Sequence, residues 1–206
     1  MMYFGLMARA QHYFLVYKPY GYLSQFSPAD GHEGLGSLGD FPKTVYPVGR
    51  LDHDSEGLLL LTNDKALNHQ LLNPRFAHPR TYWAQVEGAI TPTACDRLAA
   101  GVDIKIKGKT HHTLPARASL LDPDPVLPER NPPIRFRKSI PTSWLQLELT
   151  EGKNRQVRKM TAAVGFPTLR LVRSSIAGVQ LGSMQPGEVV PMPQKTLYRK
   201  LGLQLP

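Results

Sequence analysis

Short apolar runs alternate with polar segments rich in proline and glycine along most of the chain. Runs of four to six residues that contain β-branched or aromatic side chains are typical of strands. Such runs lie at Tyr13–Tyr17, Val45–Val48, Leu58–Leu61, Tyr82–Val86, Trp144–Leu149 and Leu169–Val172. The pattern therefore predicts a sheet built from short strands.

Two stretches have helical spacing and helical start signals. Residues 65–72 (KALNHQLL) follow Asn63 and Asp64, either of which can accept hydrogen bonds as a cap. Residues 91–101 begin with Thr91 and Pro92, a cap followed by a proline at the first helical position. We expect a short helix in each stretch.

A third helix is predicted over residues 155–165 (RQVRKMTAAVG), with Asn154 as its cap and Gly165 at its end. Its apolar face carries Val157, Met160, Thr161 and Val164. The other face is rich in arginine and lysine. Few helices among many short strands indicate an α+β fold with antiparallel sheets.

Residues 122–142 (DPDPVLPERNPPIRFRKSIPT) contain six prolines, which excludes a helix or a central strand. The segment also carries Arg130, Arg135, Arg137 and Lys138. One interpretation is a basic arm that holds a phosphate backbone, with Phe136 available for stacking on a base. The alternative is a tolerated surface insertion.

The composition indicates a globular protein of a reducing compartment. The chain has 206 residues, of which 41% are apolar and 20% are charged, enough for a sizeable core. The single cysteine, Cys95, excludes an internal disulfide and a multi-cysteine zinc site. There is no apolar run of about 20 residues and no signal-peptide pattern, so we expect a cytoplasmic protein without a membrane span.

The positive charge is concentrated in the second half of the chain. Residues 1–100 hold 8 Lys/Arg and 9 Asp/Glu, whereas residues 101–206 hold 17 and 7, within an overall net charge of +9. A segregated positive charge favours a polyanionic partner such as nucleic acid. A basic protein whose charge only keeps it soluble is the alternative.

The densest group of candidate chemical side chains lies between two apolar runs, in residues 48–64. It comprises Arg50, Asp52, His53, Asp54, Ser55 and Glu56. The three carboxylates at alternate positions could bind Mg²⁺, as in a nuclease. They could equally be solvated loop carboxylates that pair with neighbouring groups.

The same stretch, GRLDHDSEGLLLLTND, resembles the signature loop of the pseudouridine synthases, in the branch named after RsuA. RTYWAQVEG resembles the second motif of that family and EGKNRQVRKM the third. FLVYKPYGYLSQF and VGFPTLRLVRSSIAGVQLGSMQPGE also fit, so the resemblance extends from about Tyr13 to Met192. Many members carry an S4-type RNA-binding domain, but only about a dozen residues precede the first expected strand, so we expect no S4 domain here.

The resemblance implies one catalytic domain over residues 1–206, made of two α+β subdomains. Their antiparallel sheets would join into one long mixed sheet crossed by the active-site cleft. The implied reaction is the isomerisation of a specific uridine in 23S ribosomal RNA, by a monomer, without a cofactor or metal. Action on 16S rRNA or tRNA, or a non-catalytic role in ribosome assembly, are the alternatives.

The resemblance also assigns roles to individual residues. Asp52 would be the catalytic carboxylate, and Arg50 would fill the space left by the flipped nucleotide. Tyr82 would stack on the flipped base, and Leu171 would line the base pocket. Arg158 would form an ion pair with Asp52, because a guanidinium stabilises a neighbouring carboxylate charge.

Cations of the second half are expected to contact phosphates or solvent, which would make RNA affinity dependent on salt. They are Lys153, Arg155, Lys159, Arg170, Arg173 and the loop residues Arg135, Arg137 and Lys138.

Overall fold

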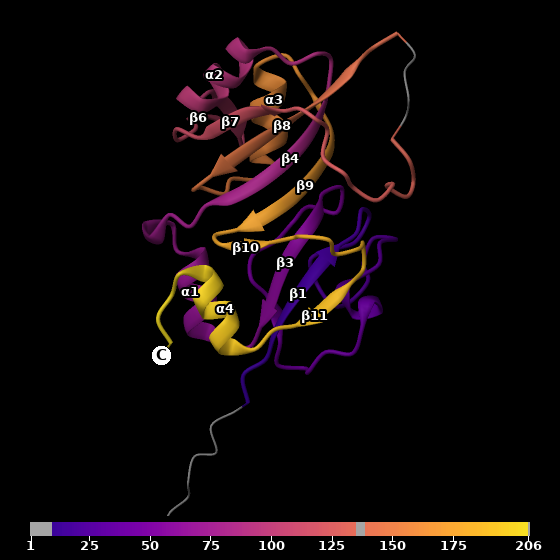
Figure 1. Cartoon of the computed structure of the whole chain (residues 1–206), viewed down its shortest axis with the longest axis vertical. Helices are drawn as coiled ribbons and strands as arrows, with labels where there is room; N and C mark the ends of the chain where they lie inside the picture. Colours follow the sequence, from indigo (N-terminus) through magenta and orange to yellow (C-terminus); the bar gives the residue numbers. More distant parts are fainter. Residues whose placement is uncertain (1–9, 135–138, 206) are drawn as a thin grey trace, which may run out of the picture.

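The computed structural model describes residues 10–134 and 139–205, which form an α+β structure around one long sheet (Figure 1). The strands are β1 (Tyr13–Lys18), β2 (Tyr46–Pro47), β3 (Glu56–Thr62), β4 (Arg80–Glu87), β5 (Asp103–Ile106), β6 (Lys109–His112), β7 (Arg117–Leu121), β8 (Thr142–Leu149), β9 (Thr168–Ile176), β10 (Val179–Gln180) and β11 (Val189–Pro191). The helices are α1 (Lys65–Leu72), α2 (Pro92–Ala100), α3 (Gln156–Ala163) and α4 (Gln194–Leu201), with short 3-10 turns η1 (Leu35–Leu38) and η2 (Pro74–Phe76). None of the described helices is long and apolar enough to cross a membrane.

The main sheet has nine strands in the order β11-β1-β3-β9-β4-β8-β7, with β2 beside β3 and β10 beside β9. Every pairing in it is antiparallel except that of β3 with β9. That parallel contact joins two antiparallel halves into one mixed sheet, which confirms the expected fold class. The joint lies at mid-length in the molecule (Figure 1).

The joint between the halves requires a glycine. Glu56 pairs with Val172 and Gly57 with Arg173. Gly57 has φ +103°, and a Cβ at this position would lie 2.4 Å from the carbonyl oxygen of Arg173. Any larger residue would therefore push β3 and β9 apart.

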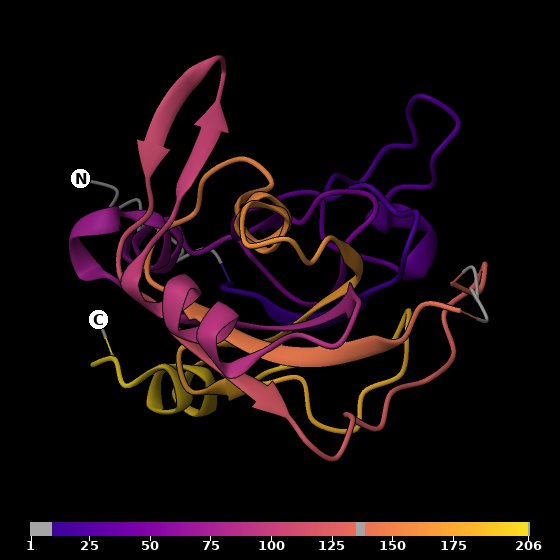
Figure 2. The same cartoon turned by 90° about the horizontal axis from the view of Figure 1, so that it is seen from above.

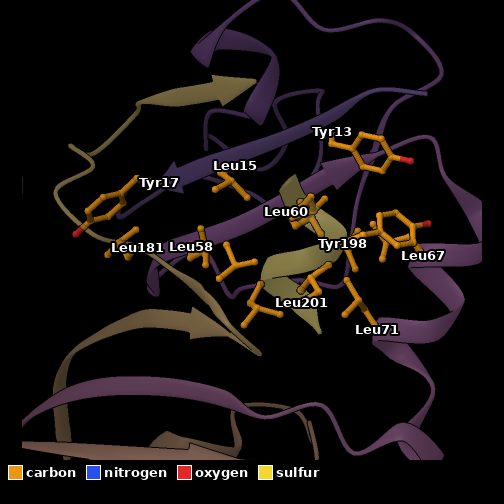
Figure 3. Packing of buried hydrophobic residues seen from close by; sticks show 14 of the residues in the cluster. Tyr13, Leu15, Tyr17, Leu58, Leu60, Leu67, Leu71, Leu181, Tyr198 and Leu201 are labelled. Carbon is orange, nitrogen blue, oxygen red and sulfur yellow. The ribbon is translucent and has the colours of Figure 1, made fainter. Parts of the chain in front are cut away.

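The leucine run of β3 reads as a continuous apolar segment because both of its faces are covered. Leu58 and Leu60 pack against α1 and α4, in the cluster shown in Figure 3. Leu59 and Leu61 belong to a separate cluster on the other face, together with Leu35 of η1.

In the other half of the sheet, α2 and α3 pack on β4 and β8 through one apolar cluster. Val157, Met160, Thr161 and Val164 are all buried, as the helical spacing predicts. This confirms the predicted apolar face of α3.

The helix caps are confirmed at two of three sites. Asp64 accepts hydrogen bonds from the first backbone amides of α1, and Thr91 does so for α2. The predicted Asn154 cap of α3 is wrong. Arg155 occupies the cap position with φ 52°, and the Asn154 amide oxygen instead accepts a hydrogen bond from Lys159.

Several elements lack a strong sequence signal and were not predicted: the β5–β6 hairpin, the exposed edge strand β7, the short strands β10 and β11, and α4. The hairpin sequence is lysine-rich, and β7 is mostly exposed, so neither shows a clear apolar pattern. Helix α4 follows Pro193 and buries Leu197, Tyr198 and Leu201 against the first half of the sheet.

The proline-rich loop runs beside the sheet towards its first half (Figure 1). Its described residues form neither helix nor strand, as predicted, except Thr142, which begins β8. The carbonyl oxygen of Pro128 accepts a hydrogen bond of 3.0 Å from Arg170, and the Arg130 guanidinium lies 4.2 Å from the centre of the Tyr20 ring. Arg130 is thus engaged within the protein, whereas Arg135, Phe136, Arg137 and Lys138 lie outside the described residues.

Candidate active site

A cavity of about 750 Å³ opens where the two halves of the sheet meet. Its wall is formed by the loop before β3, the end of α1, strands β4 and β9, and the segment that leads into α3. Of the predicted site residues, it brings together Arg50, Asp52, Tyr82, Lys153, Arg155 and Leu171.

Arg50 and Asp52 face the cavity because Leu51, the residue between them, is buried on the opposite side of the loop. Leu51 is buried, and its amide donates to the Ser24 hydroxyl oxygen at 2.9 Å. The same hydroxyl donates to the carbonyl oxygen of Leu51 at 2.7 Å. Side chains on either side of Leu51 therefore project together into the cavity, as the spacing predicts.

Asp54 is the fixed carboxylate of this loop. It accepts two hydrogen bonds from Arg155, at 3.0 and 2.7 Å, and its Oδ2 lies 3.4 Å from the Nε of Arg158. Burial alone would raise the pKa of Asp54, but the hydrogen bond from Arg155 and the charge of Arg158 outweigh burial and lower it. Asp54 is therefore held as an anion.

Asp52 is less constrained. Its side chain is 36% exposed, and its nearest described cation is Arg155, whose Nη1 lies 3.9 Å from Oδ2. Among the described residues its carboxylate accepts no hydrogen bond, so the carboxylate oxygens are available to a ligand in the cavity.

The expected ion pair between Arg158 and Asp52 is not formed. Arg158 lies within α3, where its guanidinium donates to the carbonyl oxygens of Asp54 at 2.5 Å and Thr168 at 3.4 Å. Arg155, which was expected to face phosphate or solvent, is 38% exposed and is also engaged with carboxylates. Arg155 precedes the helix in a left-handed conformation, and its side chain reaches both aspartates.

Tyr82 and Trp83 lie on opposite faces of β4, as expected for successive strand residues. Tyr82 is half-buried, lines the cavity and packs beside the apolar cluster of α2 and α3. Trp83 donates from Nε1 to Gln146 at 3.2 Å, away from the cavity lining. Leu171, 5% exposed, gives the cavity an apolar wall.

Arg170 and Arg173, which were expected to contact phosphates, are both buried, and Arg173 also lines the cavity. Arg170 donates two hydrogen bonds to the carboxylate of Glu56, at 2.9 and 2.8 Å. Arg173 donates from Nε to the carbonyl oxygen of Leu58 at 2.8 Å. Both arginines hold β9 against β3.

The remaining predicted cations are more accessible. Lys153 is exposed and lines the cavity, and Lys159 is half-buried on α3. Arg135, Arg137 and Lys138 lie outside the described residues.

Sequence reasoning missed Lys18, which ends β1 and is completely buried. Its ammonium donates to the carbonyl oxygens of Pro19 at 2.9 Å and Tyr22 at 2.6 Å, with that of His53 at 3.5 Å. The available signal was a lysine directly after the apolar run of β1. Lys18 fixes the loop that carries Asp52.

The carboxylates considered as magnesium ligands do not converge. Asp52 faces the cavity, Asp54 binds Arg155, and Glu56 is buried against Arg170. Within residues 10–134 and 139–205 there is no group of three or more His, Cys, Asp or Glu side chains that could hold a metal ion.

Comparison with known proteins defines the class of enzyme. The family model described as RNA pseudouridylate synthase matches residues 12–163, so the chain belongs to this family of isomerases.

The most similar relatives agree on one type within the family. Ribosomal large subunit pseudouridine synthase E of Vibrio vulnificus is 54% identical over 173 residues, covering 83% of this chain and 70% of that protein. The protein of the same name from Xanthomonas axonopodis is 52% identical over 174 residues, covering 84% and 89%. The segment RNPPIR followed by RKSIPTSWL also resembles the type E enzymes, so sequence and relatives concur.

A solved structure supports the fold. The crystal structure of a pseudouridylate synthase superposes with a TM-score of 0.76 at 27% identity, covering 95% of this chain and 75% of that one.

Proposed function

We propose that this protein converts one uridine of 23S ribosomal RNA, in the large subunit, into pseudouridine. The observation that carries the proposal is Asp52, a carboxylate without a hydrogen-bond partner among the described residues, in a cavity beside Tyr82 and Leu171. The names of the relatives, at 50–54% identity, support the choice of RNA.

The reaction breaks the bond between N1 of uracil and C1′ of the ribose. A new bond then forms between C5 and C1′, the proton on C5 is released, and the freed N1 carries a proton in the product. The atoms of the nucleotide are otherwise conserved, so the isomerisation consumes no redox partner or energy source. Asp52 would stabilise positive charge near C1′ or accept a proton from C2′.

The other site residues would hold the nucleotide in place. Arg50, exposed at the cavity, would occupy the stack after the target base has left it. The Tyr82 ring would lie against the base opposite the apolar wall at Leu171, and its hydroxyl could take part in proton removal at C5. Arg158 would act as a positioning residue, since it holds the loop through Asp54.

Contacts to the RNA backbone are proposed for the cations near the cavity. Lys153 and Lys159 are supported by their position on either side of the start of α3. Arg135, Arg137 and Lys138 of the proline-rich loop are proposed from the sequence alone. Arg155 would contact the substrate beside Asp52, because it lines the cavity with its Nη1 3.9 Å from Oδ2 of Asp52.

The test is tritium release from unmodified 23S rRNA that carries 5-tritiated uridine, with and without EDTA. Release that survives EDTA and disappears in Asp52→Asn, while RNA affinity persists, would establish the isomerase. Equal release by Asp52→Asn would remove Asp52 from catalysis. Release from 16S rRNA or tRNA alone would change the substrate, and none from any RNA or precursor particle would favour a non-catalytic assembly factor.

A further inference from the structure

The β5–β6 hairpin stands apart from the main sheet. Its two strands form a separate sheet, and Figure 2 shows it rising from the molecule next to α3. Two strands alone are only marginally stable in water. One face of the hairpin packs on the apolar cluster of α2 and α3, because Ile104 is 4% exposed and belongs to that cluster and Ile106, directly before the turn, packs against it.

The free end of the hairpin is strongly basic. Lys105, Lys107 and Lys109 are all exposed, and none has a carboxylate within 4.0 Å among the described residues. Lys107 and Gly108 form the two-residue turn, with φ of 48° and 79°. The Lys105 ammonium donates to the Thr110 hydroxyl oxygen at 2.6 Å, and the three ammonium groups, within five residues and without a carboxylate, form a local positive charge that favours an anionic ligand.

The base of the hairpin is connected to the cavity wall through one carboxylate. Glu151, which lines the cavity, binds the His111 ring at 3.2 Å and the backbone amide of Leu114 at 2.9 Å. Glu151 also accepts a hydrogen bond of 2.7 Å from the side-chain amide of Gln156. The Gln156 side-chain oxygen in turn accepts one of 2.8 Å from the backbone amide of Lys153. The hairpin is therefore fixed relative to the start of α3.

We propose that this lysine hairpin is a second RNA contact, which binds the phosphate backbone of the substrate outside the cavity. The inference rests on the proposed function. Each strand has four residues, so the tip extends about 13 Å from the base, far enough to meet nucleotides that flank the target.

The chemistry of the tip favours phosphate over other partners. Its exposed side chains are ammonium groups and the Thr110 hydroxyl, and no large apolar side chain there is exposed. A membrane-binding or protein-binding tip would present apolar or aromatic anchors. A row of lysines without them matches a backbone contact that reads no sequence.

The experiment measures the salt dependence of RNA binding for the triple variant Lys105→Gln, Lys107→Gln, Lys109→Gln. Each lost phosphate contact reduces the slope of log K against log salt by about 0.7 to 0.9. We expect the slope to fall by about 2 and Kd near 0.15 M salt to rise by about 10- to 100-fold. Turnover at saturating RNA should remain that of the unmodified protein, because the hairpin does not touch the reacting base.

The matched control is the triple variant Lys195→Gln, Arg199→Gln, Lys200→Gln. These cations are exposed on α4, at the other end of the molecule from the hairpin (Figure 1), and their loss changes the net charge equally. The control should keep the original slope. Equal slopes for both triples would overturn the hairpin contact. Absence of tritium release by the unmodified protein would instead overturn the proposed function, since binding slopes are measured independently of turnover.

Discussion

Two charged regions meet at the joint of the sheet, and they differ in how firmly their charges are held. The cavity loop, residues 50–55, carries Asp52 at 36% exposure with a single charged neighbour at 3.9 Å. The seam, which we define as Lys18, Glu56, Arg170 and Arg173, is buried. Its central pair, Glu56 and Arg170, is 2% and 7% exposed and joined by two hydrogen bonds.

The difference shows that residues 50–56 supply both a carboxylate for chemistry, Asp52, and a carboxylate that stabilises the sheet, Glu56. A buried charge must be partnered, because removing it from water costs several kcal/mol. Within the seam, Glu56 and Arg170 bind each other, whereas Lys18 and Arg173 donate to backbone carbonyl oxygens. The cavity loop keeps its carboxylate close to water, where its oxygens stay free for a substrate. Substitutions in the cavity loop should therefore mainly lower turnover, whereas substitutions in the seam should mainly lower the free energy of unfolding.

The largest effect is expected for Asp52→Asn. Turnover should fall by at least about 10³-fold, because the developing charge loses its stabilising group. The free energy of unfolding should change by no more than about 0.5 kcal/mol, since the side chain is exposed and weakly partnered. Single-turnover tritium release and urea titration measure the two quantities, and a large loss of stability would contradict the contrast.

The next effect is expected for Glu56→Gln in the seam. It leaves the Arg170 charge buried without its carboxylate, which should lower the free energy of unfolding by about 3 to 5 kcal/mol. Adding Arg170→Met should recover much of that loss, because the uncompensated charge is then gone. Urea titration of the single and double variants is the measurement, and additive losses would show that the two residues do not act as a pair.

A smaller effect, dependent on pH, is expected for Lys18. Burial lowers the pKa of Lys18 to about 7, although the neighbouring carboxylates of Glu56 and Asp54 oppose the shift. Between pH 7 and the unfolded pKa of about 10.4, the unfolded chain holds a proton that the folded chain lacks. The Lys18 contribution to stability should therefore rise with pH in this window, by up to about 1.4 kcal/mol per unit.

The measurement compares the original protein with Lys18→Met by urea titration at several pH values from 7 to 10. Lys18→Met should be less stable by about 2 kcal/mol at the upper end, because its carbonyl partners lose their donor. A difference between the two proteins that stays constant with pH would contradict the lowered pKa.

The smallest effect is expected for Asp54→Asn. Arg155 lowers the pKa of Asp54 against the effect of burial, so its contribution is present above the unfolded pKa and is lost as the pH falls through the folded value. We expect a loss of about 1 kcal/mol at neutral pH, since Arg155 is 38% exposed, and a smaller loss of turnover than in Asp52→Asn. Melting curves from pH 7 down to acid should converge for the two proteins.

Much of the fold could be predicted because its signals are local. Asp64 and Thr91 cap helices through side chains that lie next to the amides they bind. The leucine run of β3 indicated a strand, and the structure adds that both of its faces are covered. In contrast, α4 was missed although Leu197 and Leu201 are four residues apart, because its packing depends on the distant β1–β3 face.

The candidate site divides in the same way. A sequence motif was enough to select Asp52, Arg50 and Tyr82, which indeed line one cavity. It could not decide which arginine approaches Asp52. Arg155 and Arg158 are only three residues apart. The left-handed backbone of Arg155, directly before α3, brings its side chain rather than that of Arg158 close to Asp52.

Apolar periodicity and helix caps were thus sufficient for the fold class and for three of the helices, because both depend on neighbours in the chain. The family motifs were sufficient for the cavity residues. The partner of each charge came only with the tertiary structure. Arg170 and Arg173 look like surface cations in the sequence, yet the approach of β9 to Gly57 buries both. Burial depends on distant segments that exclude water, and the residues next to an arginine in the chain do not show which distant segments will cover it.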